Sequence, residues 1–501
     1  MTQQITKDFA LSYRELLGKI AQKNETIKKL KAKCSLLSKK SNRQVCRIAE
    51  LKESRDKLRA KNKVKSNKVK YLTKKAHGVS KPKGHQYSSL LITLSVLLRS
   101  QTGISYRHIC TVLELLKLFF ELPDSQIPCA NTLQNWTSKS GYNLLEKGDS
   151  NFLGKSVVAI VDESIQLGNY KMLLVLLAPA QKLSNQALCF QDIRIAYIGY
   201  CQSWTAQKIS ACIDKTVKKF DLSLAYILSD QDSKLVKSAA LSHVSHLPDI
   251  SHAVATSIRK SYEKQEQYQR FIKLISSYQC KGVNQDLTYL IPPNQRTKAR
   301  FMNQHAMVGW AETMLSKFDH LSLKEQVFFQ ALPQHKPIIE SLAQCLQVAQ
   351  KVSKSLKEEG FSMANCIKIT QYLSQITSID RFAQYFMGYL KAYLNKYHDF
   401  LAKEHSKQQL PDMTCINVCS DVIESMFGKY KSKISDNKLT SVSYIALELP
   451  LYSLDREQLC SQIVPSIEKV SVAKIKAWKE EYNIENQSTK RCHFFKKLQK
   501  K

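Results

Sequence analysis

The sequence predicts an α/β fold: a mixed five-stranded sheet with a large all-α insertion, preceded by a helical region and an N-terminal coiled coil. Strand-like apolar runs gather in residues 153–252, helical spacing dominates residues 253–415, and a three-four apolar repeat runs through residues 16–58. These three observations support the expected fold. With 501 residues the chain is long enough for several compact units, and its 14 Gly and 12 Pro exclude a collagen-like or mostly disordered chain.

Residues 1–84 begin with an apolar stripe at coiled-coil spacing. Its members fall on one face of a helix: Leu16, Ile20, Ile27, Leu30, Cys34, Leu37, Ile48, Leu51 and Leu58. Polar or charged residues interrupt the same stripe at Lys23, Ser41, Gln44 and Arg55. We therefore expect an imperfect coil, either weakly dimeric or folded back on another helix.

Positive charge is concentrated in the same segment. The chain has 76 Lys and Arg against 42 Asp and Glu, a formal charge of +34, and residues 1–84 carry 25 against 6, a net +19. A surplus of this size indicates a polyanionic partner, most simply nucleic acid. Lys61, Lys63 and Lys65 follow the stripe and are candidate phosphate contacts, with a solvated helical face and linker as the alternative.

Cysteine spacing and hydropathy exclude other classes of protein. The 14 Cys are scattered singly, without the paired spacing of zinc fingers or ribbons, so we expect reduced and mostly buried thiols. No apolar run reaches the length of a membrane span, and we expect no membrane partner. The polar N-terminus predicts no secretory signal.

Residues 85–148 have the pattern of a helix-turn-helix. Two apolar helical segments precede a polar-faced helix that is expected to begin near Asn131, after Pro128. A proline-bounded turn before a short polar helix suits a recognition helix in a DNA groove. Asn131, Gln134 and Lys139 are then candidates for contact with base edges, although a plain helical bundle produces a similar pattern.

Residues 153–252 carry the strand signals. Five β-branched or apolar runs are expected to be strands: residues 156–161, 171–177, 193–200, 224–228 and 246–247. Two amphipathic helices are expected between the third and fifth runs: residues 205–220 and 233–242. The resulting order, β-β-β-α-β-α-β, is that of the RNase H-like fold.

Two acids follow neighbouring strands in this order. Asp162 closes the first run and Asp230 closes the fourth. Because those strands are adjacent in an RNase H-like sheet, the two carboxylates are expected at the same edge. Converging carboxylate oxygens and substrate phosphate are the ligands that Mg²⁺ prefers, whereas a lone Asp at a strand end more often caps a turn.

At this point the sequence resembles a DDE transposase of insertion-sequence type with an RNase H-like catalytic domain. Asp162 and Asp230 match the first two acids of that family. Asp249 and His252, separated by two residues, match a motif of hAT-like and Mutator-like transposases in which Cys or Asp precedes His. The third acid, which lies far downstream on a helix, matches Glu424.

Two of these positions have an acidic neighbour that leaves an alternative open. Glu163 adjoins Asp162 on a strand that is apolar on both faces, so alternation does not choose between them. Asp421 lies three residues before Glu424 on the same helix face. Glu424 is favoured because its apolar neighbours would anchor the helix beside the sheet, with Asp421 as the helix N-cap.

The resemblance covers about residues 85–455 and implies a DNA transposase. Two Mg²⁺ or Mn²⁺ ions per active site would be held by Asp162, Asp230 and Glu424, and the enzyme would cleave phosphodiester bonds at element ends and transfer the 3′ ends to target DNA. Its partners would be double-stranded DNA and further copies, as a homodimer or larger assembly. It would be cytoplasmic and nucleoid-associated in a prokaryote, or nuclear in a eukaryote. The alternative is a transposase-derived DNA-binding protein that no longer cleaves.

Four further residues join the expected site. Asp249 and His252 are additional catalytic candidates, because His252 could orient a carboxylate or contact the scissile phosphate. A structural hydrogen bond is the alternative role for this histidine. Lys429 and Lys431 follow Glu424 and would lie near the backbone of bound DNA.

Residues 253–415 show helical spacing with almost no strand signal, so we expect an all-α insertion there. Its basic loop cluster could hold DNA or be simply solvated: Arg296, Lys298 and Arg300. The last part of the catalytic core is expected in residues 416–455, and a basic C-terminal tail in residues 456–501.

Overall fold

The computed structural model describes residues 15–31, 33–35, 51–52, 54–55, 58–59, 61–62, 80–120, 126–147, 156–167, 170–182, 184–284, 286–294, 301, 304–376, 380–406, 415–434, 442–482 and 487–499. Met1–Ser80 and Lys81–Lys501 form two separate units. In the first unit, residues 15–31 are helical, and the stripe residues Leu16 and Leu30 are about half exposed. An exposed apolar stripe is what a helix presents before it pairs with another, so the coiled coil stays a prediction.

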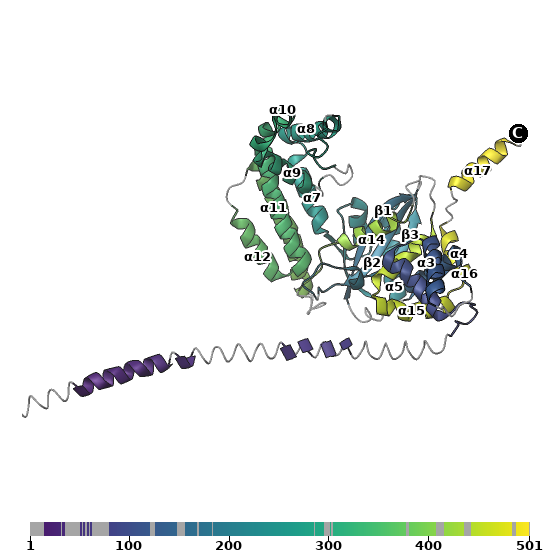
Figure 1. The fold of residues 1–501 in the computed structure, drawn as a ribbon, viewed down its shortest axis with the longest axis horizontal. Helices are drawn as coiled ribbons and strands as arrows, with labels where there is room; N and C mark the ends of the chain where they lie inside the picture. The colour runs from purple at the N-terminus through teal and green to yellow at the C-terminus, as the bar shows by residue number, and fades with distance from the viewer. Residues whose placement is uncertain are drawn as a thin grey trace, which may run out of the picture. The chain divides into compact units, whose positions relative to one another are not determined.

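The core of the second unit is a five-stranded sheet in the order β3-β2-β1-β4-β5 (Figure 1). The first three strands form an antiparallel meander, and β4 and β5 run parallel to β1. The strands are β1 Ser156–Leu167, β2 Tyr170–Pro179, β3 Arg194–Cys201, β4 Ser223–Ser229 and β5 Ser245–Pro248. This mixed arrangement is the RNase H-like topology, and it confirms the fold class that the sequence predicts.

Both faces of the sheet are buried because its central strands are apolar on both sides. One face packs against α5 and α6 through Ile209, Ile213 and Leu235. The other face packs beside α14 through Met426 and Phe427. These helices are α5 Ala206–Phe220, α6 Ser233–Leu241 and α14 Asp421–Lys431. Side chains that point from β1 toward α14 therefore lie on the face opposite α5 and α6.

The first strand is longer than the sequence indicates. β1 stays paired with β2 as far as Leu167, whereas its pairing with β4 stops where Ile160 lies opposite Leu228. The expectation that Asp162 closes the strand is therefore wrong, since this residue lies inside β1, opposite Leu174 of β2. The hairpin with β2 supports the extra length, while β1 lacks its β4 neighbour beside Asp162.

The described residues between β5 and α14 form seven α-helices, and they confirm the expected all-α insertion. The helices are α7 Ile250–Tyr262, α8 Glu266–Val283, α9 Gln304–Ser316, α10 Leu323–Phe329, α11 Lys336–Glu359, α12 Met363–Ser374 and α13 Arg381–Ser406. Figure 1 shows α8 to α12 as a group beside the sheet. The chain returns toward the sheet through a bridge residue, Ile416, which pairs with Gln181 and Phe361.

The helical region before the sheet shares its core with the C-terminal helices. Leu91 and Trp136 lie in one hydrophobic cluster with Leu459 and Ile463. The helices concerned are α2 Ser89–Leu97, α3 Tyr106–Phe119, α4 Ala130–Glu146, α15 Arg456–Lys469 and α16 Val472–Glu481. The structure thus differs from the basic tail expected for residues 456–501, because the apolar stripe of α15 packs on α2 and α4.

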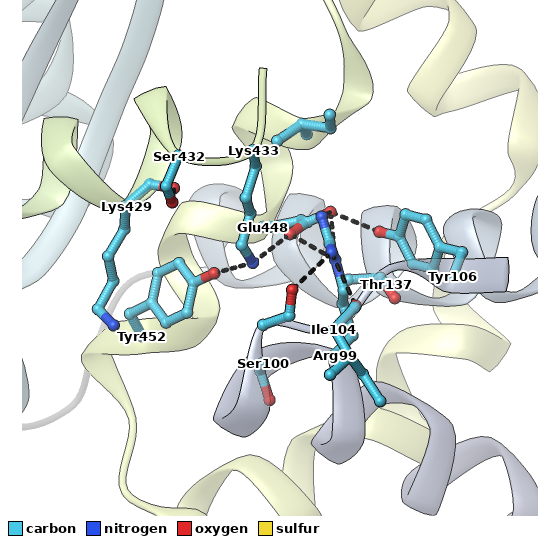
Figure 2. Close-up of polar contacts among 12 residues, drawn as sticks. Arg99, Ser100, Ile104, Tyr106, Thr137, Lys429, Ser432, Lys433, Glu448 and Tyr452 are labelled. Carbon is cyan, nitrogen blue, oxygen red and sulfur yellow. Dashed lines mark hydrogen bonds and ion pairs between the residues drawn. The ribbon is translucent and has the colours of Figure 1, made fainter. Parts of the chain in front are cut away.

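A buried ionic cluster joins this helical region to the end of α14 (Figure 2). Glu448, which is 1% exposed, accepts hydrogen bonds from Arg99 at 2.9 Å and from Lys433 at 2.8 Å. Tyr106 Oη donates to the same carboxylate at 2.6 Å, and Tyr452 contacts Lys433. Arg99 lies in the π-helical turn Leu98–Thr102, and Glu448 and Tyr452 lie in the 3-10 helix Tyr444–Ser453. The cluster therefore fastens α2 and α3 to the segment that follows α14.

Candidate active site

Two carboxylates lie at the sheet edge where β1 and β4 separate. Asp162 lies in β1 just beyond its last pair with β4, and Asp230 directly follows β4. Burial, with the negative charge of Asp230 and more weakly that of Glu424, raises the pKa of Asp162 to about 7. Asp162 is therefore close enough to interact electrostatically with Asp230, as the strand order predicts, and with Glu424.

The neighbouring acid Glu163 belongs to the other face of the sheet. Its side chain is 8% exposed and forms ion pairs with Lys171, at 3.2 Å, and with Lys234. Because successive side chains of a strand alternate between faces, Asp162 points toward the α14 side instead. The geometry favours Asp162 over Glu163 as the member of the carboxylate group.

Glu424 is placed by the apolar side of α14. Val422, Ile423 and Met426 are buried, which leaves Glu424 44% exposed in the first turn of the helix. His252 Nε2 donates a hydrogen bond to Glu424 Oε1 at 3.0 Å. Burial favours the neutral imidazole, but this bond and the nearby carboxylates outweigh it and raise the pKa of His252 to about 9. An imidazolium thus lies beside the third carboxylate at neutral pH.

Asp249 caps the starts of two helices and is not open to the solvent. It is fully buried and precedes α7, where its Oδ1 accepts from the backbone N–H of His252 at 2.9 Å. Its Oδ2 accepts from the backbone N–H of Ser420 at 2.6 Å, just before α14. Both oxygens are thus engaged, so Asp249 fixes the starts of α7 and α14 instead of facing substrate.

Asp421 is the first residue of α14 and not its N-cap, which is Ser420. Ser251 Oγ donates to Asp421 Oδ1 at 2.8 Å, and Lys357 Nζ donates to Asp421 Oδ2 at 2.5 Å. Burial alone would raise the pKa of Asp421, but these two contacts hold it below its ordinary value. The expectation of an N-cap is wrong because Lys357 of the insertion takes up this side chain.

One group of described residues brings three potential metal ligands within 4.8 Å of one another: Asp249, Cys419 and Asp421. Such a group could hold a metal ion. Burial raises the pKa of the Cys419 thiol far above its ordinary value, which disfavours the thiolate that a metal requires. Lys357 already lies against Asp421 and supplies positive charge there. Asp162 interacts electrostatically with Asp230 and with Glu424, but among the described residues these three carboxylates do not bring their oxygens within 4.8 Å of one another.

Of two histidines near the carboxylates, the sequence predicted only one as a site residue. His252 belongs to the Asp-to-His motif, whereas His246 of β5 was not singled out. His246 Nε2 lies 2.9 Å from Ser229 Oγ and 3.1 Å from the carbonyl oxygen of Asp230. Burial lowers the pKa of His246 to about 4, so the ring is neutral and supports the backbone at Asp230. A histidine in a short apolar strand beside a functional strand end is the signal that could have indicated it.

Of the three residues of α4 predicted to contact DNA bases, two are at least partly exposed and one is buried. Asn131 is exposed and Gln134 is partly buried in the first two turns of the helix. Lys139 is buried, with its Nζ 3.4 Å from the carbonyl oxygen of Ile467 in α15. Lys139 is therefore withdrawn from the candidate DNA contacts, because α15 covers the side of α4 on which it lies.

The structure describes only some of the basic residues predicted to contact DNA phosphates. Lys61 is exposed on a helical stretch of the first unit. Lys429 and Lys431 are exposed at the end of α14, and Lys429 Nζ lies 5.0 Å from the centre of the Tyr452 ring. The remaining candidates lie outside the described residues: Lys63, Lys65, Arg296, Lys298 and Arg300.

A cavity of about 780 Å³ adjoins Glu424. Glu424 and Asp421 of α14 line one side, and Val254 and Ile258 of α7 line another. Lys357 of α11 completes the wall. The insertion therefore contributes directly to the surroundings of Glu424.

Comparisons with known proteins identify no family for this chain. No protein-family description matches the chain, and no curated protein matches it. A similar solved structure is the Drosophila P element transposase strand transfer complex, with a TM-score of 0.40 and 12% sequence identity over 75% of this chain and 93% of that chain. A likeness at this level says nothing about chemistry, which depends on the residues of the site. Among the described helices, none has the length and apolar character needed to cross a bilayer.

Proposed function

We propose that this chain is a DDE-type transposase that cleaves DNA phosphodiester bonds and transfers the 3′ ends to target DNA. The observation that supports it most is the meeting of carboxylates at one sheet edge: Asp162 lies just beyond the last pair of β1 with β4, Asp230 directly follows β4, and Asp162 also interacts with Glu424. Carboxylates that converge at one sheet edge of an RNase H-like core are suited to hold cations.

The donor set fits two Mg²⁺ or Mn²⁺ ions. Asp162, Asp230 and Glu424 offer only oxygen ligands, which hard divalent ions prefer. Burial contributes most to the raised pKa of Asp162, and the repulsion by Asp230 and Glu424 that adds to it is what bound cations would relieve. Such ions, when bound, activate the attacking water or 3′-hydroxyl and stabilise the leaving oxygen of an in-line displacement.

His252 supplies positive charge and orientation at the same place. Its proton on Nε2 is held toward Glu424 Oε1, and the imidazolium persists at neutral pH because its pKa is about 9. We assign two effects to His252. Its hydrogen bond restricts the Glu424 rotamer, and its imidazolium charge attracts a DNA phosphate that approaches Glu424. Asp249 acts through His252, by capping the helix that carries it.

Double-stranded DNA, as element ends and as target, is the proposed partner. The formal charge of +34 favours a polyanion, and Lys429 and Lys431 offer exposed cations at the end of the helix that carries Glu424. Asn131 and Gln134 remain candidates for base contact. The apolar stripe of the first unit is proposed to join two copies, so that both ends can be held in one assembly.

A cleavage assay on the DNA that flanks the gene tests the proposal. Asp162→Asn, Asp230→Asn and Glu424→Gln are expected to abolish Mg²⁺-dependent nicking while binding of the same DNA survives. Glu312→Gln, an exposed acid on α9, is the matched control and should cleave normally. Undiminished nicking by one of the three variants would remove that residue from the site. Tight binding without nicking by the unchanged protein would favour a transposase-derived DNA-binding protein instead.

A further inference from the structure

A lysine of the insertion reaches the helix that carries the third carboxylate. Lys357 lies in the last turn of α11, and its Nζ is 2.5 Å from Asp421 Oδ2 at the start of α14. The other oxygen of Asp421 accepts from Ser251 of α7. One carboxylate thus joins the insertion, the helix that follows β5 and the helix of Glu424.

The surroundings of Lys357 show why a cation is needed there. Asp249, Cys419 and Asp421 place their potential ligand atoms within 4.8 Å of one another. Burial favours the neutral amine, but these three groups outweigh it and raise the pKa of Lys357. The Lys357 ammonium therefore supplies positive charge beside Asp421.

The position of Glu424 depends on this contact through the first turn of α14. Asp421 and Glu424 are three residues apart, so their side chains leave the same face of the helix. The start of that turn is also held by the hydrogen bond from the Ser420 backbone N–H to Asp249. Without Lys357, Asp421 would lose its countercharge and keep only the hydrogen bond from Ser251, which favours displacement of the helix start.

We propose that Lys357 is a positioning residue for Glu424, which makes the all-α insertion a working part of the active site. The inference rests on the proposed function for its kinetic test. Lys357 also lines the cavity beside Glu424, so direct contact with a DNA phosphate is the competing role. The two roles differ in what they do to turnover and to DNA affinity.

Kinetics of nicking separate the two roles. Lys357→Ala is expected to lower kcat by about 10²-fold, the order that a misplacement of about 1 Å can cause, with KM and DNA affinity unchanged. Lys357→Arg should recover most of the loss, because it restores the charge against Asp421. Asp421→Asn should produce a similar loss, and the double variant should be no worse than Lys357→Ala alone. Lys336→Ala, exposed at the other end of α11, is the matched control.

Two outcomes overturn the positioning role. A loss carried by KM or DNA affinity, largest at low salt and additive with Asp421→Asn, would assign Lys357 to phosphate contact. Full activity in Lys357→Ala would remove it from the site altogether. If Lys357→Ala does not fold, Lys357→Met serves instead, because it keeps an unbranched aliphatic stem.

Hydrogen exchange tests the contact between Lys357 and Asp421 without relying on catalytic activity. In Lys357→Ala the backbone amides of residues 420–427 should exchange faster than in the unchanged protein, whereas Lys336→Ala should leave them unaltered. Unaltered exchange at α14 would contradict the positioning role. If Lys357→Ala exchanges faster at α14 but the unchanged protein never nicks DNA, the proposed function is refuted. The role of Lys357 in holding the start of α14 is then still supported.

Discussion

At Asp162, burial and two neighbouring carboxylates act in the same direction. The pKa is about 7 in the folded chain against an ordinary value of 3.8, so the folded chain binds this proton more tightly than the unfolded chain. The free energy of unfolding therefore falls as the pH rises from about 4 to about 7, and the penalty is complete above that range. A residue that weakens the fold in this way is typical of a site kept for function.

Asp162→Asn removes the ionisation and should stabilise the metal-free protein. In EDTA we expect a Tm well above that of the unchanged protein at pH 8, and a much smaller gain at pH 4, where the folded chain carries the protonated acid and the acid of the unfolded chain is about half ionised. A gain of several degrees is expected, because each kcal/mol corresponds to roughly 2–4 °C for domains of 150–250 residues. Scanning calorimetry at the two pH values measures it, and an equal shift at both would contradict the electrostatic explanation.

Glu163 provides the residue-scale contrast, because it lies one position away and on the opposite face. Its partners are Lys171 and Lys234, not the carboxylate group. Glu163→Gln should therefore lower Tm modestly, through lost ion pairs, and retain nicking within a few-fold of the unchanged protein. Parallel melting and nicking assays on Glu163→Gln and Asp162→Asn check this, and loss of nicking in both variants would reopen the choice between the two acids.

At the scale of elements, Glu448 holds the helical region to the segment after α14. Arg99 and Lys433 both donate hydrogen bonds to the Glu448 carboxylate, and Glu448 is 1% exposed (Figure 2). Glu448→Gln would leave two buried cations without a countercharge, which costs about 3–5 kcal/mol when one partner of a buried pair is removed. Urea unfolding measures the loss. Glu146→Gln, whose partner Lys219 is at the surface, is the control and should cost under about 1 kcal/mol.

Local signals in the sequence were sufficient for the sheet and for α14. Strands that are β-branched and apolar on both faces predict a buried sheet, and Val422, Ile423 and Met426 predict which side of α14 is buried. Those two elements also bring Asp162 and Glu424 together. The strand end at Asp162 was missed because pairing with β2 extends β1, which a run of apolar residues alone does not indicate.

Contacts between distant segments could not be predicted in the same way. Lys139 looks like a surface residue of α4, and its burial depends on Ile467, which lies 328 residues further along the chain. Lys357 has no local motif, and its role follows only from the place where α11 meets Asp421. Polar side chains of this kind satisfy partners that only the folded chain supplies.

At the scale of the whole molecule, the densest positive charge and the carboxylate group belong to different units. All three hydrophobic clusters lie in Lys81–Lys501, together with the carboxylate group. The first unit has exposed apolar residues and most of the +19 that residues 1–84 carry. Residues 81–501 should therefore fold without the first unit and keep Asp162, Asp230 and Glu424 in place.

Removal of residues 1–80 should weaken DNA binding by a term that is independent of sequence. Lysines and arginines that neutralise phosphates release counterions, so the slope of log affinity against log salt counts these contacts. The shortened chain should show a shallower slope, the same preference for element ends over other DNA, and a smaller assembly in light scattering. Binding titrations at several salt concentrations provide the measurement, with Glu312→Gln in the full chain as a control that leaves the first unit intact. An unchanged slope would place the phosphate contacts in the second unit, and a lost preference for element ends would place sequence reading in the first.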